Sequence, residues 1–199
     1  LIPLSAYLAL LHTQPLLPGR RALLVDLDAR FAAIARQSVA TVADLWQRLS
    51  TPAKLAAFAQ ATGIDGEWLN LLRREMGSLK ADPLPLSSFP WVGEGLLAAL
   101  AAEGIHTTRD YFESAHFGTD ELSALCELTR INGVGPAAAR AFREAGFATA
   151  QAIADATAAG LLARMTAVND AKGYYRAKLG EKDMQFCIDC ARLLVAYAK

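Results

Sequence analysis

The sequence has few residues of the kinds that build reactive sites. Only three cysteines and three histidines occur in 199 residues, and the cysteines form an odd set, Cys126, Cys187 and Cys190. Small secreted domains that are held by disulfides need a denser, even set. We therefore expect a chain that folds around an ordinary apolar core in a reducing compartment, the cytoplasm.

Net charge and long apolar runs are also missing. Lys plus Arg and Asp plus Glu both total 20, so the chain lacks the basic surplus of a typical nucleic-acid binder. Any such binding must be local, and residues 125–199 do carry ten basic side chains against seven acidic ones. The apolar opening, residues 1–11, is too short to span a bilayer. We expect no membrane contact.

No catalytic motif appears in the sequence. It contains no P-loop lysine, dinucleotide fingerprint, metalloprotease motif or serine elbow. Cys187 and Cys190 have the spacing of a redox pair, but no strand precedes them, and a structural zinc site would need four ligands. We interpret the cysteines as small buried apolar residues. We expect no enzyme, no catalytic residue, no cofactor and no metal.

Helix signals are plentiful. Alanine and leucine dominate, alternating β-branched runs are almost absent, and 53% of the residues are apolar, enough for a well-buried core. Thr51 followed by Pro52 is typical of an N-cap and a first helical residue. Asp65 can cap a helix that ends at Gly77. The sequence predicts an all-α fold.

Two segments of the chain resemble each other. Phe89–Gly93 aligns with Ile131–Gly135, and the same alignment, without a gap, places Gly104 on Gly146 and Thr107 on Thr149. In both segments we expect a tight turn, a helix ended by the glycine, and a second helix capped by the threonine. A fainter third copy has Leu23–Leu27 at the turn, Ser38 at the glycine position and Thr41 at the cap. Chance periodicity in an Ala/Leu-rich chain explains that third match equally well.

Ile131-Asn132-Gly133-Val134-Gly135-Pro136 has the pattern of a helix-hairpin-helix turn, with Ala139 and Phe142 on the inner face of the second helix. In hairpins that bind DNA, such a turn points backbone N–H groups and the positive helix end at a phosphate. Nearby basic side chains add charge to this contact, and here they are Arg130, Arg140 and Arg143. However, the two residues directly after the proline are alanines. Gly133, Val134 and Gly135 can therefore serve either nucleic-acid contact or helix packing alone.

A second candidate surface lies before the last helix. Lys172, Arg176 and Lys178 are interleaved with two tyrosines, which suits backbone contacts combined with base stacking. The alternative is a connecting segment whose tyrosines pack on the core while its basic residues are solvated. If both candidate surfaces bind nucleic acid, they must lie on one face of the molecule.

These features predict tandem helix-hairpin-helix-like repeats with helical spacers, a SAM-like bundle in two lobes. Pro83 and Pro85 exclude helix from the segment 80–88, which we interpret as a linker. We expect a helical lobe with a degenerate hairpin over 1–79. A second lobe, over 89–199, then contains two hairpin-like repeats and a terminal helix.

The sequence also resembles the bacterial family known as domain of unknown function 4332. The resemblance rests on residues 58–65, 69–75, 128–136, 145–149 and 167–172, and on a last helix after residues 179–183. It implies an α-helical fold with hairpin repeats similar to DNA-binding ones, and no known activity or catalytic residue. Two functions follow: a nucleic-acid-binding module, most simply a non-sequence-specific DNA binder, or a protein-interaction scaffold.

Overall fold

The structure is a computed structural model that describes residues 1–79 and 81–197. It is all-α: the described residues form helices, with two isolated β-bridges and no β-strand. Contacts divide it into two compact units, residues 1–79 with 196–197, and residues 81–195. Within the described residues, no helix is both long and apolar enough to cross a bilayer.

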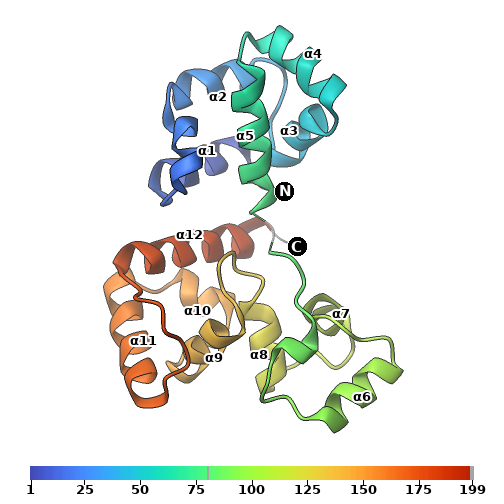
Figure 1. Cartoon of the computed structure of the whole chain (residues 1–199), viewed down its shortest axis with the longest axis vertical. Helices are drawn as coiled ribbons and strands as arrows, with labels where there is room; N and C mark the ends of the chain where they lie inside the picture. The colour runs from blue at the N-terminus through green and yellow to red at the C-terminus, as the bar shows by residue number, and fades with distance from the viewer. Residues whose placement is uncertain (80, 198–199) are drawn as a thin grey trace. The chain divides into compact units, whose positions relative to one another are not determined.

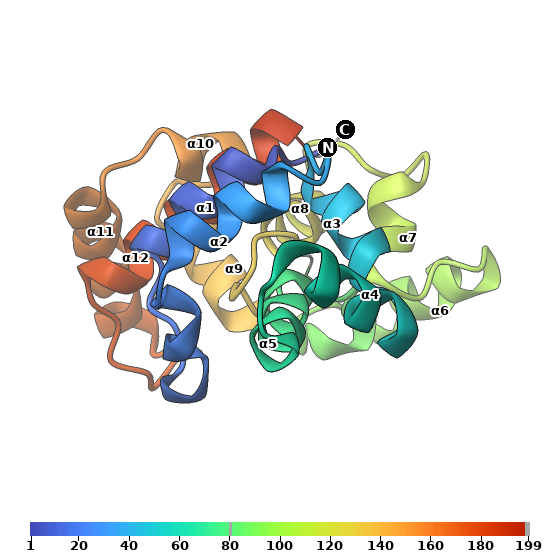
Figure 2. The same ribbon diagram turned by 90° about the horizontal axis from the view of Figure 1, so that it is seen from above.

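The first unit contains five α-helices and one 3₁₀ segment. In chain order these are α1 (Leu4–Thr13), η1 (Pro18–Leu24), α2 (Leu27–Ala35), α3 (Val42–Leu49), α4 (Pro52–Thr62) and α5 (Gly66–Gly77). Helix α1 packs along α2, where the rings of Tyr7 and Phe31 lie 6.0 Å apart (Figures 1 and 2). The predicted caps are confirmed: Thr51 accepts from the amide of Lys54, and Asp65 from that of Trp68.

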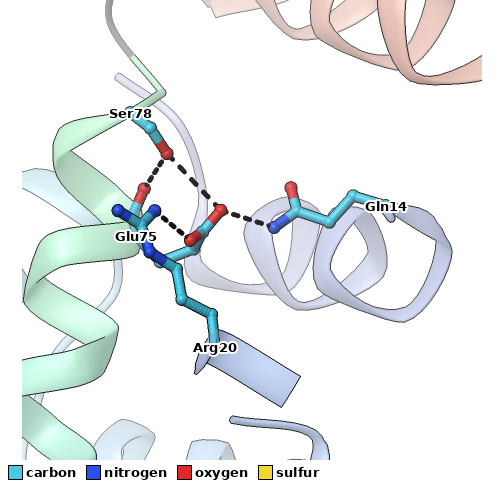
Figure 3. Close-up of polar contacts among 4 residues, drawn as sticks. All are labelled: Gln14, Arg20, Glu75 and Ser78. Carbon is cyan, nitrogen blue, oxygen red and sulfur yellow. Dashed lines mark hydrogen bonds and ion pairs between the residues drawn. The ribbon is translucent and has the colours of Figure 1, made fainter. Parts of the chain in front are cut away.

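A buried carboxylate ties three segments of this unit together (Figure 3). Glu75 of α5 is only 8% exposed and pairs with Arg20 of η1. Gln14 donates to the same carboxylate at 2.8 Å, and the hydroxyl of Ser78 donates to the Glu75 carbonyl at 2.6 Å. A buried charge is tolerated only when it is paired and hydrogen-bonded, so these contacts fix η1 and the end of α1 against α5.

The second unit contains the remaining helices. They are η2 (Leu86–Ser88), α6 (Glu94–Ala102), α7 (Thr108–Glu113), α8 (Glu121–Leu128), α9 (Pro136–Glu144), α10 (Ala150–Ala154), α11 (Ala158–Lys172) and α12 (Glu181–Tyr197). Its core is continuous from Leu86 to Ala191 and includes the predicted inner-face residues Ile131, Val134, Ala139 and Phe142. The all-α prediction is confirmed.

The proline-rich segment differs from its prediction. Its last three residues form the 3₁₀ turn η2, in which the amide of Ser88 donates to the carbonyl of Pro85. A proline excludes helix only for the residues before it, so a turn can start at Pro85. Leu86 is 2% exposed, and its amide donates to the carbonyl of His106. The described end of this segment is therefore packed into the second unit.

Three joints between helices share one backbone geometry. Ser38, Gly104 and Gly146 each have a positive φ, of 58°, 78° and 90°. Three residues further on, Thr41, Thr107 and Thr149 each cap the next helix with their hydroxyl. Serine rarely adopts a left-handed conformation, so its presence at the first joint indicates that the surrounding structure imposes this turn.

Candidate nucleic-acid interface

The turn between α8 and α9 is shaped by one left-handed glycine. Gly133 is exposed and has φ +83°, and a Cβ there would lie 3.6 Å from the ring of Phe186 on α12. Ile131 and Val134 on either side are 1% and 5% exposed, and the amide of Val134 donates to the carbonyl of Ile131 at 3.1 Å. Two buried anchors thus hold the glycine at the surface.

Helix α9 begins without a cap of its own. Gly135 is its N-cap residue, no side chain accepts from its first turn, and that turn contains no acidic residue. The first amides of a helix have no intrahelical acceptor, so those of Ala137 and Ala138 lack one. Helices α7, α8, α10 and α11 each begin with a Thr or Asp side chain as cap. The start of α9 is thus left open to an external acceptor, which anions provide best.

The earlier turn, Phe89–Gly93, copies this geometry only in part. The amide of Val92 donates to the carbonyl of Phe89 at 3.0 Å, and Gly93 is an uncapped N-cap like Gly135. Trp91, in place of the first glycine, does not have a positive φ. Glu94 stands in the first turn of α6 and places a negative charge at the helix start. An external anion is therefore repelled from this turn.

A further hairpin, between α4 and α5, was missed by the sequence reasoning. Gly63 has φ +70°, Ile64 is 6% exposed, and Asp65 is the N-cap of α5. As at Gly133 and Val134, a left-handed glycine and a buried branched residue precede the N-cap, but Gly63 directly ends α4 whereas α8 already ends at Leu128. The signal that could have identified it is a glycine and an apolar residue directly after one helix and before the N-cap of the next.

Arg140 lies at a junction of three segments. Its guanidinium carbon is 4.6 Å from the ring centre of Trp91 and 4.9 Å from that of Tyr174. Its Nε is 3.4 Å from a carboxylate oxygen of Glu144, and the hydroxyl of Tyr174 donates to the same carboxylate. Arg140 therefore joins the turn before α6, helix α9 and the loop after α11. We expect its loss to destabilise this unit.

The other two hairpin arginines also have partners within the chain. Arg143 pairs with Glu121 at 3.5 Å, and Arg130 lies 3.9 Å from the ring centre of Phe112. Partial burial lowers the pKa of the Arg130 guanidinium from its ordinary value. All three arginines lie near the turn, as their sequence positions predict, but each is held by other side chains. Their contact with nucleic acid stays a prediction.

The basic residues before α12 are arranged differently. Lys172, Arg176 and Lys178 are exposed and form no ion pair with the described part of the chain. Through Tyr174 and Arg140 their loop contacts α9, and Figure 1 shows it, in deep orange, passing beside that helix. The structure thus brings the two candidate surfaces together.

The two tyrosines of this loop both contact other residues of the second unit. Tyr174 contacts Arg140 and Glu144, and the hydroxyl of Tyr175 donates to the carbonyl of Met165 at 3.2 Å. Partial burial raises the pKa of Tyr175. The packing interpretation therefore holds for the tyrosines, while the basic side chains remain available.

The three cysteines lie in the core of the second unit. Cys126 is on α8, Cys187 and Cys190 are on α12, and all three are free thiols. Burial raises the pKa of each thiol to about 12. The described residues contain no group of three or more His, Cys, Asp or Glu side chains that could hold a metal.

The comparison with family models finds one match. Residues 127–172 are similar to the SAM-like helix-hairpin-helix tandem, a region that starts at the end of α8 and contains α9, α10 and α11. The turn at Gly133–Gly135 lies inside the match and the turn at Phe89–Gly93 outside it. Neither the curated proteins nor the solved structures gave a match. The resemblance to domain of unknown function 4332 stays a prediction.

Proposed function

We propose that the second unit binds the backbone of nucleic acid, most simply duplex DNA, without reading its sequence. A phosphate occupies the open start of α9, where the amides of Ala137 and Ala138 donate to it. Lys172, Arg176 and Lys178 add positive charge from the neighbouring loop. Gly133 has no side chain, so a phosphate can approach the backbone of the turn closely.

One observation carries the proposal: α9 starts at a glycine, with no capping side chain and no acidic residue in its first turn. A helix start of this kind favours an anion through its free amides and its dipole. The similarity of residues 127–172 to the helix-hairpin-helix tandem supports a nucleic-acid backbone as that anion, since this family often binds nucleic acid. Contacts limited to phosphates carry no sequence information.

The expected binding is weak and depends on salt. Each phosphate contact contributes about −0.9 to the slope of log affinity against log salt, so three loop cations and one helix start give a slope of about −3.6. Non-specific binding of this size has a dissociation constant in the range of about 1–100 μM at physiological salt. The zero net charge of the chain adds no long-range attraction.

The test is fluorescence anisotropy with two labelled duplexes of unrelated sequence, from about 50 to 200 mM salt. We expect equal affinity for both duplexes. Changing Lys172, Arg176 and Lys178 to alanine should make the slope shallower by about 2 to 3. The matched control changes Arg36, Arg48 and Arg74, three exposed arginines of the first unit, and should leave the slope unchanged. If the folded protein binds neither duplex at the lowest salt, the proposal is wrong.

A further inference from the structure

Each unit begins with the same backbone arrangement. Pro3 forms an isolated antiparallel bridge with Thr41, and Pro85 forms the same bridge with Thr107. In each case the residue after the proline donates its amide to the carbonyl of the residue before the threonine, at 2.8 Å and 2.9 Å. The threonine then starts the next helix, α3 or α7, with a capping box that an aspartate completes. The segments from Pro3 to α3 and from Pro85 to α7 are therefore two copies of one structural motif.

The register of the two copies follows from the end of α2 and of α6, the helices before these threonines. The left-handed Ser38 donates its amide to the carbonyl of Ala35 at 3.1 Å. The left-handed Gly104 donates its amide to the carbonyl of Ala101 at 3.0 Å. Ala35 of α2 thus corresponds to Ala101 of α6, and the residues before them correspond one by one.

The first copy contains a helix that the second lacks. The ten residues of α1 follow the first bridge, whereas the three-residue turn η2 follows the second. Helix α1 covers α2 through two contacts. The ring of Tyr7 lies 6.0 Å from that of Phe31, and Nε2 of His12 lies 3.0 Å from a carboxylate oxygen of Asp28. Phe31 is only 3% exposed in this packing.

The matching face of α6 bears the same two kinds of side chain. The counterparts of Asp28 and Phe31 are Glu94 and Leu97, which lie on one face because they are three residues apart. Among the described helices of the second unit, none packs along α6 as α1 packs along α2, and α6 lies at the edge of this unit (Figure 1). Leu97 is only partly buried and Glu94 is exposed. The Glu94 carboxylate makes no hydrogen bond or ion pair with the described part of the chain.

The composition of α6 also suits a covered helix. Apart from Glu94 it consists of glycine, alanine and leucine, yet only Leu100 is fully buried. Exposed apolar faces of this kind are typical of protein interaction sites. The first copy shows what such a face packs against. It is a helix with a tyrosine and leucines on its inner side and a basic residue, His12, opposite the carboxylate.

We propose that a helix of a partner protein binds α6 in the place that α1 takes on α2. It packs an aromatic or leucine side chain on Leu97 and pairs a basic side chain with Glu94. An acidic helix is disfavoured, because it would place like charges together at Glu94. Nucleic-acid binding by the second unit is not required for this docking.

The probe is a peptide with the sequence of α1, residues 3–14, in which His12→Lys fixes the positive charge at neutral pH. A matched peptide carries His12→Glu. In NMR spectra of the full chain, the Lys peptide should shift the amide signals of Glu94 and Leu97. Those of Asp28 and Phe31 should stay in place, because the chain's own α1 already covers α2. The Glu peptide should bind about fivefold more weakly.

Three variants of the full chain test the two contacts. In Glu94→Lys the preference should invert, so that the Glu peptide binds more tightly than the Lys peptide, while circular dichroism confirms an unchanged helix content. Leu97→Ala should weaken binding of both peptides. Its matched control, Leu96→Ala, removes a more exposed leucine that lies about 100° around the helix and should leave binding unchanged.

Several results would overturn the proposal. They are equal binding of both peptides to the unaltered chain, no shift at about 1 mM peptide, or equal losses in Leu96→Ala and Leu97→Ala. A dimer of the unaltered chain that Leu97→Ala dissociates also overturns it, because the occupant is then a second copy.

Discussion

Each unit contains a hairpin in which a left-handed glycine and a buried branched residue precede a helix. In the first unit these are Gly63 and Ile64 before α5, and in the second Gly133 and Val134 before α9. The next residue differs: Asp65 closes α5 with its carboxylate, whereas Gly135 leaves α9 open. One side chain thus decides whether a helix start is satisfied from within the chain or can accept an external anion.

The side chains around the two hairpins also differ in charge. Beside the closed turn lie Glu67 and the exposed apolar Val25. The loop that packs beside α9 bears the unpaired cations Lys172, Arg176 and Lys178. The comparison teaches that the N-cap residue and its neighbours, rather than the left-handed glycine, set the charge around each helix start.

The largest effect should come from the glycine that both hairpins share. Gly63→Val and Gly133→Val should each destabilise their own unit by about 2 kcal/mol, because a β-branched residue is strained at positive φ. The loss should be larger at Gly133, where the added methyl groups meet Phe186. Urea unfolding followed by amide signals of each unit measures both. Gly95→Val, at an open helical site, is the control and should cost nothing.

Replacing Gly135 by aspartate should give α9 a side-chain cap like the one that Asp65 gives α5. In Gly135→Asp the new carboxylate accepts from the amide of Ala138, and affinity for duplex DNA should fall at least tenfold, or by about 1.4 kcal/mol. The site has room for the side chain, since nothing lies within 4 Å of a Cβ there. Stability should stay equal or rise by a few tenths of a kcal/mol.

A matched control separates the closed turn from the added charge. Gly93→Asp places the same charge at the start of α6, where Glu94 already stands. Anisotropy should show little change in affinity for this variant. Equal losses in both variants would mean that charge alone, and not the start of α9, governs binding.

The reverse change should have a smaller effect. Asp65→Ala should cost the first unit about 1 kcal/mol, because the amide of Trp68 loses its acceptor, whereas Asp65→Gly should cost only a few tenths. Urea unfolding of the two variants checks this. If they lose the same stability, the carboxylate is not what stabilises α5.

The smallest effect concerns the aspartate in the first turn of α3 and of α7, one in each unit. Asp44 accepts from the hydroxyl and the amide of Thr41, and Asp110 accepts from the amides of His106 and Thr107. These hydrogen bonds lower the pKa of both carboxyls from 3.8. A lowered pKa stabilises the fold above pH 3.8 and the benefit is lost as the pH falls through the lower native value. Asp110→Asn should therefore flatten the acid dependence of unfolding in the second unit. Asp82→Asn, an exposed change, should not.

Local features could be predicted from the sequence. The caps at Thr51 and Asp65 and the burial of Ile131, Val134 and Phe142 depend on neighbours within one or two turns, and the structure confirms them. The partners of Arg140 could not be predicted, because Trp91 and Tyr174 are far from it in the sequence. The α4–α5 hairpin was missed because Asp65 stands where the helix-hairpin-helix pattern has its second glycine.

The buried cysteines make the rate of thiol labelling a measure of how often the second unit opens. Thiolate is the species that reacts, and with a pKa of about 12 each thiol is almost entirely protonated at neutral pH while the core is closed. Labelling therefore waits for the helices around Cys126, Cys187 and Cys190 to separate. The first unit contains no cysteine, so its opening leaves no trace in the labelling rate. The labelling rate with a thiol reagent thus reports the local opening of the second unit alone, in the unaltered chain and without any attached dye.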